Sequence, residues 1–126
     1  MVHYSQIVAD YFAHPVNAGT LSGNADSVIS GVAGDRAQGT EVAFHLRVED
    51  REIAEISFQA FGCPHTIAAC SLATERLTGQ PVDALVELTA KSLAMALEAP
   101  VEKMGRMLLL EDALRNCFIA WDNRPN

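Results

Sequence analysis

A strand gives way to a helix at Phe61-Gly62-Cys63-Pro64-His65. Before this stretch, apolar and polar residues alternate over 53–61, which is typical of a half-buried strand. After it, apolar residues recur every three or four positions over 64–78, which is typical of a helix with one buried face. Pro64 suits the first position of a helix, because the N–H that proline lacks would have no partner there. Cys63 is therefore expected at a helix N-terminus, where unpaired N–H groups and the helix dipole favour a thiolate.

Upstream of this point, the chain predicts two further strands. The clearest alternation of apolar and polar residues runs over 41–48, and a polar turn over 49–52 separates it from 53–61. This spacing predicts an antiparallel hairpin. A shorter strand is predicted around 28–32, and we expect it at an edge of the same sheet.

The rest of the chain is predicted to be helical. Periodic apolar residues mark the segments 3–13, 64–78, 81–86, 90–98 and 103–121. The first of these is expected to bury the stripe Tyr4, Ile7, Val8, Tyr11 and Phe12. The last is expected to bury the stripe Met107, Leu110, Leu114, Cys117 and Trp121. The sequence thus predicts a single α+β domain over 1–126.

Composition and charge argue against several classes of protein. The chain has 126 residues, 49% of them hydrophobic, which is enough for one core. A formal net charge of −7 with nine scattered basic residues argues against binding to nucleic acid or to an anionic membrane surface. No apolar run reaches the roughly 20 residues that span a bilayer, and the N-terminus lacks the features of a signal peptide. We therefore expect a cytoplasmic protein without a membrane span.

Cys63 is the first candidate for a functional side chain, although cysteine also packs as a small buried residue. Cys70 and Cys117 lie on predicted apolar stripes and are expected in the core. Three cysteines, an odd number, indicate reduced thiols rather than disulfides. His65 could assist Cys63 in binding a metal or in protonating a leaving group, but a histidine exposed at the helix start is the main alternative. The sequence contains no glycine-rich phosphate loop, no Ser/His/Asp signature and no Cys-x-x-Cys pair.

Several short strings resemble the NifU/IscU family of iron–sulfur cluster assembly scaffolds. They are His-Pro-Val-Asn-Ala-Gly at 14–19, Phe-Gln-Ala-Phe-Gly-Cys at 58–63 and Glu-Asp-Ala at 111–113, and the likeness extends from about Tyr4 to Trp121. The resemblance implies a three-stranded antiparallel sheet packed against about five helices. It also implies that the protein holds an iron–sulfur cluster, or an iron or zinc ion, and works with a cysteine desulfurase or other assembly proteins.

The chain departs from this family at the ligand positions. The resemblance implies a cysteine and an aspartate where Gln38 and Thr40 stand, and a histidine and a cysteine where Gly105 and Arg106 stand. Of the three expected cysteines, only Cys63 is present. If Arg106 lies near Cys63, as the resemblance implies, its charge disfavours a metal cation and lowers the pKa of the thiol.

Three interpretations follow. The leading one is a scaffold-like protein of iron–sulfur cluster assembly, with Cys63 as a metal or cluster ligand and His65 as a secondary one. Since a [2Fe–2S] cluster takes about four protein ligands, a homodimer would offer two copies of each. The alternative is a ligand-poor paralogue that acts as an interaction, regulatory or sulfur-accepting module through Cys63. The weakest is a thiol enzyme, because no orienting acid or oxyanion hole is evident; the chain is expected not to be an enzyme.

Overall fold

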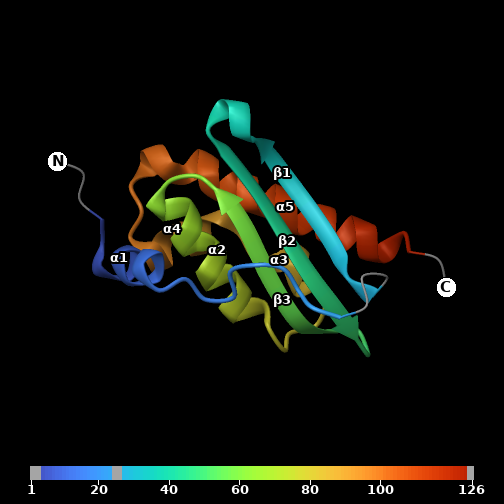
Figure 1. The fold of residues 1–126 in the computed structure, drawn as a ribbon. Helices are drawn as coiled ribbons and strands as arrows, with labels where there is room; N and C mark the ends of the chain where they lie inside the picture. Colours follow the sequence, from blue (N-terminus) through green and yellow to red (C-terminus); the bar gives the residue numbers. More distant parts are fainter. Residues whose placement is uncertain (1–3, 24–26, 125–126) are drawn as a thin grey trace.

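A three-stranded antiparallel sheet, with helices packed on one of its faces, forms the centre of the molecule (Figure 1). The computed structural model describes residues 4–23 and 27–124. The helices and strands of this part are α1 (Gln6–Ala13), β1 (Ile29–Asp35), β2 (Thr40–Glu49), β3 (Glu52–Phe61), α2 (Pro64–Leu77), α3 (Ala84–Glu87), α4 (Ala90–Leu97) and α5 (Met104–Asp122). Two short 3-10 turns, Arg36–Gln38 and Val101–Lys103, precede β2 and α5. The predicted fold class is confirmed.

The sheet has the strand order β1-β2-β3, with β1 at an edge as predicted. Strands β2 and β3 form the predicted hairpin, and Phe44 lies opposite Phe58 in its register. The two residues of its turn, Asp50 and Arg51, have φ angles of 51° and 64°. Such left-handed conformations match the twist of the strands that a two-residue hairpin loop joins.

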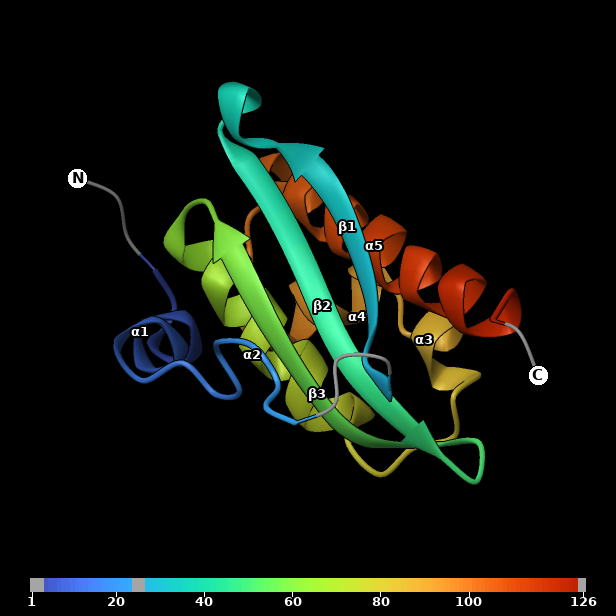
Figure 2. The ribbon, with the colours of Figure 1, turned by 45° about the vertical axis from the view of Figure 1, so that its right-hand side comes forward.

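The core lies between this sheet and the helices behind it. Figure 2 shows α5 running behind β1 and β2, whereas α2 packs behind β3. From β2, the buried residues are Val42, Phe44 and Leu46. From α5, they include the whole predicted stripe Met107, Leu110, Leu114, Cys117 and Trp121. The alternation along β2 and the three-to-four-residue spacing along α5 therefore predicted the buried faces correctly.

The contact between β1 and α5 depends on Gly31. A Cβ atom at Gly31 would lie 2.5 Å from both the carbonyl oxygen of Ala113 and the backbone nitrogen of Cys117. The helix thus packs directly on the strand backbone. Val32, which helped to predict this strand, is 50% exposed, because it points away from α5.

Three predictions about helices need correction. Helix α1 begins at Gln6, after the N-cap residue Ser5, rather than at 3, and residue 3 itself lies outside the described residues. Of the stripe expected on α1, only Val8 is buried, and Phe12 is 49% exposed. The reason is that α1 packs along α2 at the side of the molecule and offers it a narrow face (Figure 1). Helix α3 begins at Ala84 rather than at 81, since the backbone N–H of Ala84 closes a tight turn on the carbonyl of Pro81.

No helix within 4–23 or 27–124 has the length and apolar character that crossing a membrane requires.

Candidate functional site

Cys63 occupies the position that the sequence predicts for it. It is the N-cap residue of α2, with an extended backbone (φ −82°, ψ 171°), and Pro64 begins the helix. Its side chain is half-buried, and its Sγ lies 3.6 Å from Oγ1 of Thr66 in the first helical turn. A Cβ atom at Gly62 would approach Thr66 Oγ1 to 2.9 Å, so glycine there leaves room for Thr66 beside the sulfur.

The surroundings of Cys63 favour its thiolate. Burial alone would raise the pKa of this thiol. The polar groups beside the sulfur, namely the backbone and hydroxyl of Thr66 and the backbone of His65, favour the charged form and outweigh burial, and the positive charge of Lys103 adds to their effect on the pKa. The net result is a Cys63 pKa below its ordinary value, so more of the nucleophilic, metal-binding form is present at neutral pH.

His65 lies close to Cys63 in sequence but is not exposed, so that expectation is wrong. Its side chain is 2% exposed, and its ring packs against Tyr4 with the ring centroids 5.0 Å apart. Burial lowers the pKa of His65, and the charges of Lys103 and Arg106 lower it further. The imidazole is thus kept neutral, and its Nδ1 has no hydrogen-bond partner in the part of the chain that is described.

Positive charge gathers at this end of α5. Lys103 ends the turn before the helix and Arg106 lies in its first turn. Among residues 4–23 and 27–124, neither has a carboxylate within ion-pair distance, and the Nε of Arg106 is buried without a partner. The candidate site is therefore cationic, although the whole chain carries a net charge of −7.

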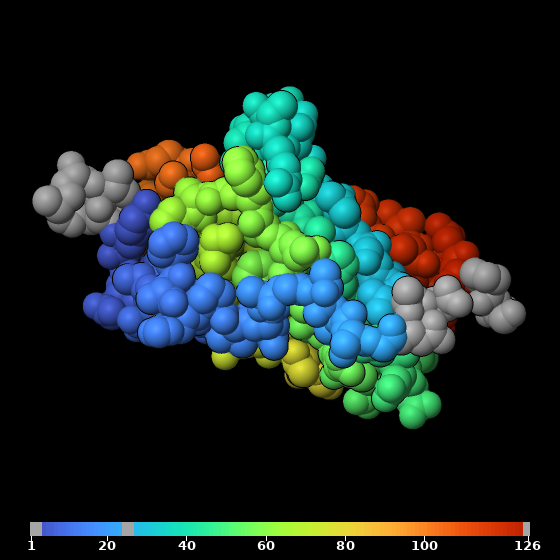
Figure 3. Space-filling view, viewed as in Figure 1, coloured from blue at the N-terminus to red at the C-terminus, as the bar shows by residue number. Residues whose placement is uncertain are grey.

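The other ligand positions that the resemblance implies hold no alternative ligands. Gln38 ends the turn that connects β1 to β2, and Thr40 begins β2, where this part of the chain projects from the body of the molecule (Figure 3). Gly105 faces open space at the start of α5. Across the described ranges, no group of three or more His, Cys, Asp or Glu side chains could hold a metal ion. One chain therefore does not supply a complete set of ligands for a cluster.

The remaining two cysteines are core residues, as predicted. Cys70 and Cys117 are both 0% exposed and free of disulfides. Burial raises the pKa of both thiols, in the case of Cys117 to about 12. Neither is available as a nucleophile or a metal ligand in the native fold.

Two residues of the site, Thr66 and Lys103, were not predicted from the sequence. Thr66 stands three positions after the N-cap residue, and that spacing could have indicated a contact with the sulfur. Lys103 is far from Cys63 in sequence, and only the packing of α2 against α5 brings their ends together.

Comparisons with known proteins agree with this description. Residues 3–126 match the NifU-like N terminal domain model. The chain is 34% identical over 113 residues to the iron-sulfur cluster assembly scaffold protein IscU of Escherichia coli (strain K12), covering 89% of this chain and 88% of that one. It is 36% identical over 117 residues to the iron-sulfur cluster assembly scaffold protein IscU 1 of Archaeoglobus fulgidus, covering 92% and 74%.

A solved structure shares the fold. It is the crystal structure of a nitrogen-fixing NifU-like protein (N-terminal) from Brucella abortus, with a TM-score of 0.73 over 96% of this chain and 95% of that one. At 16% sequence identity, this likeness concerns the fold alone.

Proposed function

Because this chain belongs to the NifU-like N-terminal domain family, we propose that it is a scaffold-type protein of iron–sulfur cluster assembly, with Cys63 as its sulfur ligand. The observation that carries the role of Cys63 is its environment. Of the three cysteines, it alone is accessible and has a lowered pKa. A thiolate at that position can bind iron or hold sulfur.

The charge of the site supports a thiolate-bound cluster over a bare metal ion. A [2Fe–2S] cluster with four thiolate ligands has an overall charge of about −2, whereas a free metal ion is positive. Lys103 and Arg106 have no carboxylate partners in the described ranges, so they repel a cation and attract the anionic complex. Arg106 in place of a cysteine ligand is therefore compatible with cluster binding, provided that other thiolates complete the coordination.

Those thiolates must come from outside one chain. A cluster takes about four protein ligands, and Cys63 is the one accessible thiol here. A second copy of the chain would add its own Cys63 thiolate, and further copies, the two His65 side chains or another assembly protein such as a cysteine desulfurase would supply the rest. His65 could take part only if the Tyr4 side chain moved off its ring. The proposal includes no catalytic turnover, and it places this assembly work in the cytoplasm.

Anaerobic reconstitution with ferrous iron and sulfide tests the proposal. Iron, acid-labile sulfide and visible absorption are measured for the wild type, for Cys63→Ser and for the matched control Cys117→Ala. We expect bound iron and sulfide in the wild type and in the control, and their loss in Cys63→Ser. Thermal unfolding of each variant confirms that the fold is retained. A wild type that binds neither iron nor sulfide, or a Cys63→Ser variant that binds as much as the wild type, would overturn the proposal.

A further inference from the structure

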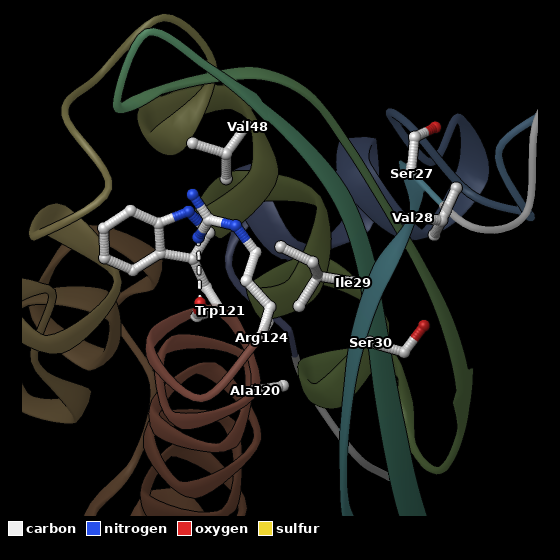
Figure 4. A pocket seen from close by; sticks show the side chains of 8 residues that line it. All are labelled: Ser27, Val28, Ile29, Ser30, Val48, Ala120, Trp121 and Arg124. Atoms are coloured by element: carbon white, nitrogen blue, oxygen red, sulfur yellow. Dashed lines mark hydrogen bonds between the residues drawn. The ribbon is translucent and has the colours of Figure 1, made fainter. Parts of the chain in front are cut away.

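A second site lies at the opposite end of α5. A cavity of about 440 Å³ opens between the start of β1 and the last turn of this helix (Figure 4). Its walls include the apolar side chains of Ile29, Val48 and Trp121. Fifteen helical residues separate Trp121 from Arg106, which corresponds to roughly 22 Å along the helix axis. The cavity is thus distinct from the surroundings of Cys63.

One guanidinium group, that of Arg124, lines the cavity, and a second, that of Arg51, lies close to the same indole ring. Arg124, which lines it, lies 4.5 Å from the centroid of the Trp121 ring, and Arg51 lies 4.9 Å from the same centroid. Within the described part of the chain, Arg124 donates one hydrogen bond, to the carbonyl oxygen of Trp121 at 2.8 Å, and most of its donors have no partner there. In the described ranges neither arginine has a carboxylate within ion-pair distance, although Asp122 lines a smaller neighbouring hollow together with Arg51 and Arg124.

The indole of Trp121 provides a further unused donor. Trp121 is 5% exposed, and its Nε1 is buried without a hydrogen-bond partner among the described residues. In Figure 4 the edge of the indole that carries this nitrogen lies beside the guanidinium of Arg124, on the side of Val48. A buried N–H without a partner costs about 1–3 kcal/mol, and an acceptor on a ligand would remove that cost.

We propose that this cavity binds a small anionic amphiphile, of the class of medium-chain or aryl carboxylates. The carboxylate would accept hydrogen bonds from Arg124, whose forked donors match its geometry, and from Nε1 of Trp121. The apolar body would lie against Ile29 and Val48. The cavity volume falls in the range of about 300–1,000 Å³ that is common for small-molecule sites.

The chain carries its own reporter for this site. Trp121 is its only tryptophan, so fluorescence excited at a wavelength that the two tyrosines do not absorb reports on the cavity wall. Titration of the full chain with octanoate, below its micellar concentration, is expected to give a saturable change in fluorescence. Octylamine, which has the same chain length but a positive charge, is expected to give none.

Two variants test where octanoate binds. Ala120 is exposed on α5 and lines the cavity, so Ala120→Leu fills the space without disturbing the core. Arg124→Gln removes the proposed partner of the carboxylate, and Arg115→Gln, on the exposed face of α5, is its charge-matched control. We expect Ala120→Leu and Arg124→Gln each to weaken binding roughly tenfold or more, and Arg115→Gln to bind as the wild type does.

Affinities are taken from the midpoints of the titrations, because replacing Arg124 also changes the starting fluorescence of Trp121. The proposal is overturned if octanoate gives no saturable change, if octylamine binds equally well, or if Ala120→Leu and Arg124→Gln bind like the wild type. None of these outcomes depends on iron or sulfide, so failure here leaves the role of Cys63 untouched.

Discussion

The three cysteines of the chain lie in different environments, and these environments shift the pKa values of their thiols in different directions. Cys70 and Cys117 are buried with raised pKa values, whereas Cys63 is half-exposed with a lowered one. Because iodoacetamide reacts with thiolates, we expect the native protein to gain one adduct, at Cys63, and the urea-unfolded protein to gain three. Mass spectrometry of intact and digested protein counts and locates them. Fast labelling of Cys70 or Cys117 in the native state would contradict this description.

The charge of Lys103 contributes to the lowered pKa of Cys63. A lowered pKa means that the thiolate persists to lower pH, so removing a positive charge that stabilises the thiolate must raise the pKa of Cys63. Lys103→Gln is therefore expected to shift the midpoint of the alkylation pH–rate profile of Cys63 to higher pH. Lys91→Gln, an exposed lysine on α4, removes the same charge elsewhere and should leave it unchanged. Equal midpoints for the two variants would rule out the contribution of Lys103.

At the scale of single residues, the local sequence predicted the position of Cys63 but not all of its neighbours. The strand that ends before it and Pro64 after it are enough to place it at a helix start. The burial of His65 was not predictable in this way. The ring of Tyr4, at the N-terminal end of the described chain, packs against the His65 ring, and this contact is distant in sequence.

At the scale of elements, the packing of α5 on β1 leaves no room for a side chain at position 31. Gly31→Ala is expected to lower the free energy of unfolding by about 1–3 kcal/mol, as overpacking of a core does. Gly105→Ala is the matched control, because its Cβ would meet no atom within 4 Å. In a helix this change is neutral or stabilising by up to about 1 kcal/mol.

Urea unfolding of the two glycine variants measures both effects. Equal stabilities for Gly31→Ala and the wild type would show that the helix does not lie on the backbone of β1 in the way described.

The elements that the sequence predicted best are those with one extended contact face. Strand β2 and helix α5 each bury one complete face, so their periodicities of two and of three to four residues appear plainly. Helix α1 contacts α2 with a narrow face, and most of its apolar residues stay accessible. The requirement for glycine at position 31 leaves no periodic pattern in the sequence. It depends on how closely α5, which is distant in sequence, approaches β1.

At the scale of the whole molecule, the chain has the complete fold of the NifU-like N-terminal domain, but its described residues supply an incomplete set of cluster ligands. One end of α5 places Lys103 near Cys63 and Arg106 near His65, and the other end places Arg124 over Trp121. Family membership and fold could be predicted from the sequence, since they depend on strings and periods that lie along the chain. The number of chains that would be needed to hold one cluster could not be predicted, because it depends on surfaces that meet between molecules.

Native mass spectrometry of the anaerobically reconstituted protein, exchanged into buffer without small-molecule thiols, tests the central claim most directly. Since one chain offers one accessible thiolate, the cluster mass is predicted on particles of two or more chains and absent from single chains. The Cys63→Ser protein should give no cluster-loaded particle of any size. A single wild-type chain that carries a complete cluster would contradict the account, because it would require ligands that the described residues do not provide.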